Sequence, residues 1–214
     1  YYKVVKGVTS IVEKSALGIT TSVGDFSTGL SEPSFTERLV DDSYSLPSGK
    51  RSRYDNTYKE ATVSCNKDGH TVQFIFRVYD DGVAYRYAIL GSGDISVYAE
   101  NSECLPVRQE KVYSQQYTKN NQALYEENDT EFMACELYTP LPLLVHTGSD
   151  YQIFQPTDCQ YRGYGISSTS RHDDRANFGR QQSERCHKIS NDDYGHYFHS
   201  LYVIINDHHL AGIP

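Results

Sequence analysis

The sequence contains no tryptophan, one methionine and no uninterrupted apolar run of about 18 residues, the length that a membrane-crossing helix needs. We therefore expect no membrane span. Positive charge is also scarce, because 28 acidic side chains outnumber 20 lysines and arginines and give a net charge of −8. With no basic stripe to neutralise phosphates, we expect no nucleic acid partner and no anionic membrane surface.

Short catalytic motifs are missing as well: there is no Gly-x-Ser-x-Gly elbow, phosphate loop or His-Glu-x-x-His helix. The five cysteines lack Cys-x-x-Cys spacing, which argues against a zinc ribbon or a thioredoxin-like site. They are Cys65, Cys104, Cys135, Cys159 and Cys186. An odd number leaves at least one thiol unpaired within the chain. The cysteines are either buried small hydrophobic residues or members of one or two disulfides in an oxidising compartment.

Strand-forming residues, by contrast, are plentiful, with 19 tyrosines among 214 residues. Residues Thr71 to Leu90 alternate apolar and polar side chains with period two on both sides of Asp80-Asp81-Gly82. The alternation places four apolar residues on one face, namely Val72, Phe74, Phe76 and Val78. Asp-Gly supplies the positive φ angles that a tight turn needs, so this stretch predicts a β-hairpin. So long a hairpin needs a second sheet over its apolar face, and we expect further strands elsewhere.

Shorter alternating segments support an all-β fold along the rest of the chain. We predict an opening hairpin over Tyr1–Val12, strands over Phe35–Val40 and Tyr58–Ser64, and a closing buried strand over His199–Asn206. Two polar stretches predict exposed connections, at Thr20–Ser34 and Ser170–Asp193. No period of 20 to 50 residues repeats, which excludes solenoids and propellers. The length suits one large domain over residues 1–214.

The nine-residue stretch Tyr79–Tyr87, with the sequence Tyr-Asp-Asp-Gly-Val-Ala-Tyr-Arg-Tyr, resembles the amino-terminal domain of glycoside hydrolase family 97. Supporting segments follow in the expected order: Ser15–Gly18, Gly49–Ser52, Tyr58–Glu60, Thr139–Leu141, Gly148, Tyr151 and Tyr161–Tyr164. The resemblance implies an antiparallel β-super-sandwich of the galactose-mutarotase type. In that family the domain precedes a (β/α)8 barrel that carries the catalytic carboxylates.

Family members are α-glucosidases and α-galactosidases, many of them calcium-dependent. The resemblance therefore implies a non-catalytic domain that packs on the barrel, lines its sugar pocket and meets an oligosaccharide there. The chain ends about where the barrel is expected to begin, so we expect no glycoside hydrolysis by this chain alone. We also expect a periplasmic or extracellular location.

The resemblance also points to candidate site residues. A family glutamate that helps to bind calcium, on the strand leading to the Tyr-x-Gly segment, corresponds to Gln155, six residues before Tyr161. An amide oxygen can ligate a hard cation but brings no charge. We expect no cofactor in this chain alone and calcium only together with the barrel. Tyr161 and Tyr164 lie in the same short segment, where aromatic rings beside the amide would either receive a sugar or pack at the domain junction.

Other polar residues have two interpretations each. Asp80 and Asp81 are either turn residues or an acid/base pair, although neighbours in a turn point in different directions. Arg77 and Arg86 are on flanking strands and would form ion pairs, with Glu60 or the turn acids, or clamp a substrate. Two other functions stay open: a free-standing carbohydrate-binding or protein-interaction sandwich, and an independent mutarotase-type enzyme with a converging His and Glu.

Overall fold

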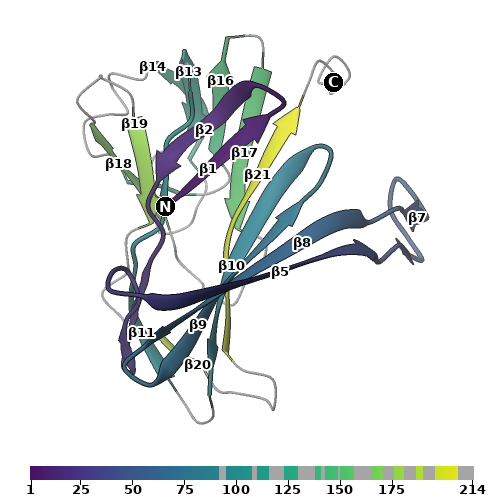
Figure 1. Cartoon of the computed structure of the whole chain (residues 1–214). Coiled ribbons are helices and arrows are strands. Elements are labelled where there is room, and N and C mark those ends of the chain that lie inside the picture. Colours follow the sequence, from purple (N-terminus) through teal and green to yellow (C-terminus); the bar gives the residue numbers. More distant parts are fainter. Residues whose placement is uncertain are drawn as a thin grey trace.

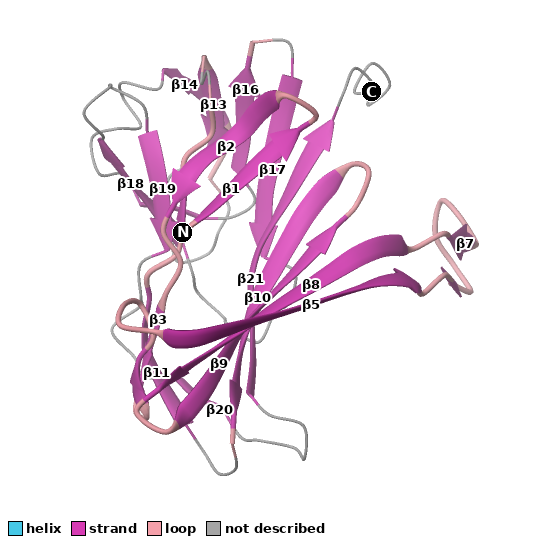
Figure 2. Cartoon of the chain, in the orientation of Figure 1, coloured by secondary structure: helices cyan, strands magenta, loops and turns pink. Residues whose placement is uncertain are grey.

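The computed structural model describes residues 1–91, 95–107, 110–115, 123–129, 138–140, 143–148, 150–156, 165–170, 176–180, 187–189 and 196–206. Within these ranges the chain forms strands and turns and no helix (Figure 2). The described residues accordingly hold no helix that could cross a bilayer. The predicted all-β class is confirmed.

The largest element is a nine-stranded antiparallel sheet (Figure 1). From one edge to the other, its strands are β14 (Glu126–Asp129), β13 (Lys111–Ser114), β16 (Leu143–Thr147), β17 (Asp150–Pro156), β21 (His196–Asn206), β10 (Gly82–Leu90), β9 (His70–Val78), β8 (Thr57–Lys67) and β5 (Ser31–Asp41). The last described strand, β21, therefore lies in the middle of the sheet and joins its two halves.

Smaller antiparallel sheets accompany the large one. They are β1 (Tyr2–Lys6) with β2 (Thr9–Ser15); β20 (His187–Ile189), β11 (Ile95–Glu100), β3 (Ile19–Thr21) and β4 (Gly24–Asp25); β12 (Glu103–Cys104), β19 (Ala176–Arg180), β18 (Gly165–Ser170) and β15 (Tyr138–Pro140); and β6 (Tyr44–Ser45) with β7 (Arg53–Tyr54). Side chains from β1, β2, β3, β11 and β12 share one core with the large sheet, so these strands form the second layer of a sandwich.

The two polar connections predicted from the sequence are partly wrong. Thr20–Ser34 contains β4, and its Phe26 is buried in the core with 1% exposure. The stretch Ser170–Asp193 contains β19 and β20, which pair with β18 and β11. The strands β4, β19 and β20 are only two to five residues long and belong to small sheets. Short strands of this kind leave little periodicity in a sequence.

The predicted central hairpin is confirmed, but its turn differs in one respect. β9 and β10 pair in register from Val78 opposite Val83 to Thr71 opposite Leu90. None of Asp80, Asp81 and Gly82 has a positive φ. The loop is instead closed by the Tyr79 N–H, which donates to the Gly82 carbonyl at 2.8 Å. The residues with positive φ are in the preceding turn, where Asp68 and Gly69 (φ 51° and 81°) join β8 to β9.

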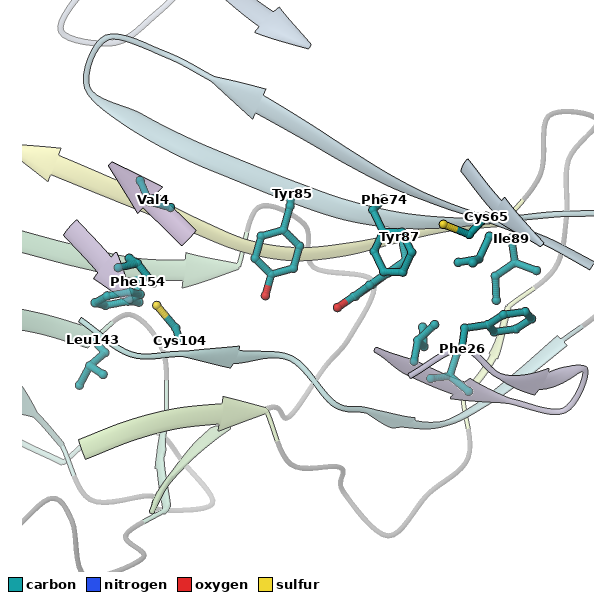
Figure 3. Close-up of a cluster of buried hydrophobic side chains, with 14 of the residues drawn as sticks. Val4, Phe26, Cys65, Phe74, Tyr85, Tyr87, Ile89, Cys104, Leu143 and Phe154 are labelled. Atoms are coloured by element: carbon teal, nitrogen blue, oxygen red, sulfur yellow. The ribbon is translucent and has the colours of Figure 1, made fainter. Parts of the chain in front are cut away.

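The inner face of the hairpin is aromatic (Figure 3). Phe74 and Tyr87 meet edge to face with ring centroids 5.5 Å apart, and Tyr85 meets Tyr87 at 6.0 Å. Of the four apolar residues predicted to share this face, Val72 and Phe74 are buried and Phe76 is half-buried. Val78 is 46% exposed. It lies at the end of β9, beyond the part of the sheet that the second layer covers.

Tyr87 is fully buried, and its hydroxyl joins the two layers. It accepts a hydrogen bond from the Gly18 N–H at 3.1 Å and lies 2.6 Å from the Ser102 hydroxyl, which in turn donates to Glu100 at 2.7 Å. Since the Ser102 proton goes to Glu100, Tyr87 donates to Ser102. Burial raises the pKa of Tyr87 well above its ordinary value. Gly18 also packs closely against Ser27, and a Cβ at position 18 would overlap the backbone and side chain of that residue.

The described cysteines behave as buried small hydrophobic residues. Cys65 and Cys104 are both free and buried. Burial raises the pKa of both thiols, that of Cys104 to about 12, so neither is an effective nucleophile at neutral pH. Cys135, Cys159 and Cys186 lie outside the described residues, and their pairing stays open.

Replacing Tyr87 with phenylalanine tests the contact between the layers. The change leaves the Gly18 N–H buried without an acceptor, so we expect the free energy of unfolding to fall by about 2 kcal/mol in urea denaturation. Tyr98→Phe is the control, because Tyr98 is 44% exposed and its change should stay within about 0.5 kcal/mol. Equal effects of the two substitutions would show that the buried hydroxyl adds nothing.

Candidate functional site

The register of the large sheet aligns one residue from each of six neighbouring strands in a single row. From β17 to β5, the row consists of Gln155, Tyr202, Ala84, Arg77, Glu60 and Arg38. Directly opposed residues of antiparallel strands share a face of the sheet. Ala84 and Arg77 alternate with Tyr85 and Phe76, which contact each other within the core layer, so the row is on the outer face. We call these six residues the transverse row.

Glu60 is the charged centre of the transverse row. Its side chain is 7% exposed, and both carboxylate oxygens are occupied. Arg38 donates from Nε at 2.9 Å and from a terminal nitrogen at 2.6 Å to Oε1, and Arg77 donates from Nε at 2.9 Å to Oε2. Burial raises the pKa of Glu60, but hydrogen bonds and charge from the two arginines outweigh it and hold the pKa below its ordinary value. Glu60 is therefore ionised at neutral pH and cannot donate a proton.

Two tyrosines fix the orientation of Arg77. Its guanidinium lies over the Tyr58 ring, 4.6 Å from the centroid, and the Tyr58 and Tyr79 rings are 5.1 Å apart. Burial lowers the pKa of Arg77, and its hydrogen bond to Glu60 more than compensates, so that the pKa is raised. Of the two interpretations of Arg77, the structure supports the ion pair with Glu60. The arrangement holds the Arg77 guanidinium in one orientation, against the Glu60 carboxylate and the buried Tyr58 ring, and is suited to positioning.

A second group of aromatic side chains is on the same face, nearer to Gln155. The rings of His146 and Tyr151 are stacked at a tilt of 32° with centroids 4.6 Å apart. The Tyr113 hydroxyl donates to Glu127 at 2.9 Å, and Glu110 lies 3.4 Å from His146 Nδ1. Sequence analysis missed Tyr113 and His146. The alternation in Leu143–Thr147 would have placed His146 on the face opposite the buried Leu143 and Val145.

The predicted site residues are only partly within the described structure. Gln155 lies on β17 opposite Tyr202, at one end of the transverse row. Tyr161 and Tyr164 lie outside the described residues, so the predicted grouping of these three stays a prediction. Asp80 and Asp81 are in the β9–β10 turn. In the part of the chain that the structure describes, no three His, Cys, Asp or Glu side chains are grouped as metal ligands.

Comparison with known proteins identifies the family. The family described as Glycosyl-hydrolase 97 N-terminal matches residues 1–171, which is most of the chain. The chain belongs to this family. The family 97 domain is also 32% identical over 127 residues to a probable retaining alpha-galactosidase of Streptomyces bingchenggensis (strain BCW-1), a match that covers 58% of this chain and 20% of that protein.

Solved structures show that the family 97 domain has a known fold. A glycoside hydrolase family 97 enzyme from Pseudoalteromonas sp. strain K8, in complex with acarbose, superimposes with a TM-score of 0.77 over 96% of this chain at 14% identity. A beta-arabinopyranosidase superimposes with a TM-score of 0.78 over 93% of this chain at 18% identity. The domain spans 32% and 35% of those two chains. The predicted resemblance and the all-β sandwich are both confirmed.

Glu60→Gln tests the ion pairs of the transverse row. Loss of the charge-assisted hydrogen bonds should lower the free energy of unfolding at neutral pH by roughly 2 kcal/mol, measured by urea denaturation. A depressed pKa in the folded state means that this contribution is complete above the ordinary pKa of 4.5 and is lost as pH falls through the folded value. The difference between wild type and variant should therefore shrink in acid.

Glu37→Gln provides the matched control. Glu37 lies 3.4 Å from Lys59, and both side chains are more than half exposed, at 51% and 58%. Such surface pairs contribute about 0.5 kcal/mol, so this variant should resemble the wild type at every pH. If Glu60→Gln changed stability no more than Glu37→Gln, the transverse row would have no energetic role.

Proposed function

We propose that this domain is a non-catalytic part of a glycosidase, that it packs against the catalytic barrel of that enzyme, and that the face carrying Gln155 lines one side of the sugar pocket. The observation that carries the proposal is the family match over residues 1–171, in a chain that spans about a third of its structural neighbours. The substrate class would be an α-glucoside or α-galactoside.

The chemistry of the outer face supports a role in binding. Glu60 is ionised and accepts three hydrogen bonds from two arginines, which stabilise the carboxylate and make it a weak base. Tyr113, His146 and Tyr151 are half-buried and lie on β13, β16 and β17, and β17 also carries Gln155. Half-exposed aromatic rings pack well against the apolar faces of sugars, while hydroxyl and carboxylate groups at their edges bind sugar hydroxyls.

Calcium would have to take most of its ligands from the barrel. Calcium needs six to eight oxygen ligands, several of them carboxylates. The described residues of this chain do not supply such a group, and Gln155 would add one neutral oxygen. The described residues alone therefore do not make up a calcium site.

A periplasmic or extracellular location belongs to the same proposal. The buried thiols of Cys65 and Cys104 are compatible with an oxidising compartment, because burial raises their pKa and keeps them protonated and unreactive.

Gln155→Ala in the complete enzyme tests the proposed pocket wall. Loss of one hydrogen-bonding group at the pocket should lower kcat/KM for an aryl α-glucoside or aryl α-galactoside roughly tenfold. Gln73→Ala is the matched control, since Gln73 is also an amide on the outer face, outside the transverse row, and bonds Ser64. Equal kcat/KM for wild type and Gln155→Ala would show that Gln155 is not part of the pocket wall.

Gln155→Glu tests calcium in the same enzyme. A carboxylate at position 155 should increase calcium affinity, measured by isothermal titration, because affinity rises with the number of charged ligands. An unchanged affinity would show that residue 155 does not ligate the metal.

Sugar binding without any turnover by the complete protein would favour the free-standing carbohydrate-binding sandwich.

A further inference from the structure

The edge strand β5 is exposed to solvent along nearly its whole length. Of its eleven residues, Val40 is half-buried and the others are exposed. Phe35 and Leu39 are 62% and 76% exposed. Figure 1 shows β5 and β8 extending together beyond the rest of the sheet towards β6 and β7. Long exposed edge strands with apolar side chains promote unwanted pairing, and proteins normally cover them.

The exposed apolar residues Phe35 and Leu39 of β5 belong to the core face of the sheet. Phe35 is opposite Val63, which is opposite Phe74, and Phe74 is 7% exposed. Along this row the second layer covers β9 but does not reach β5. The next row on this face contains Glu37, Ala61 and Phe76. In the row after it, Leu39 is opposite Lys59 and Lys59 opposite Val78, and here even Val78 on β9 is exposed. The core face of the large sheet therefore extends beyond the part that the second layer covers. We call Phe35, Leu39 and Val78 the apolar strip.

Two charged side chains lie within the apolar strip, Glu37 between Phe35 and Leu39 on β5 and Lys59 between Leu39 and Val78. Glu37 pairs with Lys59, and Arg38 pairs with Glu60. Glu32 accepts a hydrogen bond from Asn66 at 3.1 Å. With Glu37 and Lys59 paired to each other, the other side chains of the strip are apolar. Exposed apolar patches on a domain mark protein contact surfaces. A partner for this surface should itself be apolar, and the contact should depend little on salt.

We propose that the apolar strip is the surface on which the catalytic domain of the same polypeptide docks. The inference rests on the proposed function and names the contact surface that it requires. The occupant follows from the family, which is an amino-terminal domain, and from the structural neighbours, in which this domain is about a third of the chain. The remaining two thirds of such a chain supply a large surface that is always present at high effective concentration.

Sheet twist makes this docking compatible with a pocket wall at Gln155. Five strand-to-strand steps separate β17 from β5. Neighbouring strands rotate by about 20–25° each, so the sheet turns by roughly 100° between the two. Figure 1 accordingly shows β5 running across the direction of β17. A single large domain can therefore meet the core face at β5 and the outer face at β17.

Hydroxyl-radical footprinting of the complete enzyme, read by mass spectrometry, tests the apolar strip. Leu39 and Leu124 are the same residue type and are 76% and 83% exposed in this domain. If the catalytic domain covers the strip, Leu39 should lose most of its labelling while Leu124 keeps it, at low and at high salt. Labelling of Leu39 as strong as that of Leu124 would overturn the proposal. So would protection of Leu39 that is present in a dimer and lost in the monomer, because the occupant would then be a second copy.

A pair of variants gives an independent test in the same enzyme. Leu39→Glu should uncouple the domains, so that one calorimetric unfolding transition becomes two. Thr36→Glu introduces the same charge on the same strand, where Thr36 is exposed and opposite Thr62 on the other face, and should leave one transition. Identical scans for the two variants would contradict the proposal.

The two proposals fail in different ways. A labelled Leu39 in an active glycosidase would overturn the docking surface alone. A protected Leu39 in a protein without glycosidase activity would overturn the proposed function and leave the docking surface in place.

Discussion

The antiparallel register of β8, β9 and β10 determines what both faces of the large sheet can do. One alignment places Val63, Phe74 and Tyr87 in a row towards the core. The same alignment places Glu60 and Arg77 together on the outer face. Because side chains alternate with period two, a slip of one residue would turn the side chains of the shifted strand to the opposite face of the sheet. A slip of β9 would bury the Arg77 guanidinium among aromatic rings. Interactions on both faces of the sheet therefore favour this register.

Polar groups in this domain join elements that are far apart in the chain. The Tyr87 hydroxyl connects β10 to Gly18 and Ser102 in the second layer, and Glu60 connects β5 to β9. A buried ion pair adds little net stability compared with apolar packing, but removing one partner is costly. Such groups select one arrangement of strands over its alternatives. In this domain the selected arrangement keeps Gln155, Arg77 and Arg38 in one row across six strands.

Local sequence signals predicted the local structure well. The hairpins of β1 with β2, β8 with β9 and β9 with β10 were all predictable, because alternation and turn residues act over a few positions. The positive φ predicted for the Asp81-Gly82 turn was wrong, since a loop closed by the Tyr79 N–H does not need it. The buried Phe26 was missed because one aromatic residue among serines and glycines carries no periodicity.

Features that depend on distant pairing could not be predicted in the same way. Arg38 joins Glu60 because β5 pairs with β8, and nothing near either residue specifies that pairing. The exposure of Phe35, Leu39 and Val78 depends on where the second layer ends, which alternation within β5 does not reveal. The resemblance to family 97 predicted Gln155 as a candidate site residue, and the register of the sheet showed which residues share its row.

The central claim is that β8 and β9 hold Glu60 and Arg77 directly opposite each other on one face. A double-mutant cycle with Glu60→Gln and Arg77→Met, measured by urea denaturation at neutral pH, tests this most directly. The register predicts a favourable coupling energy of about 1–3 kcal/mol between the two side chains. Additive effects, with a coupling below about 0.5 kcal/mol, would contradict it and with it the transverse row.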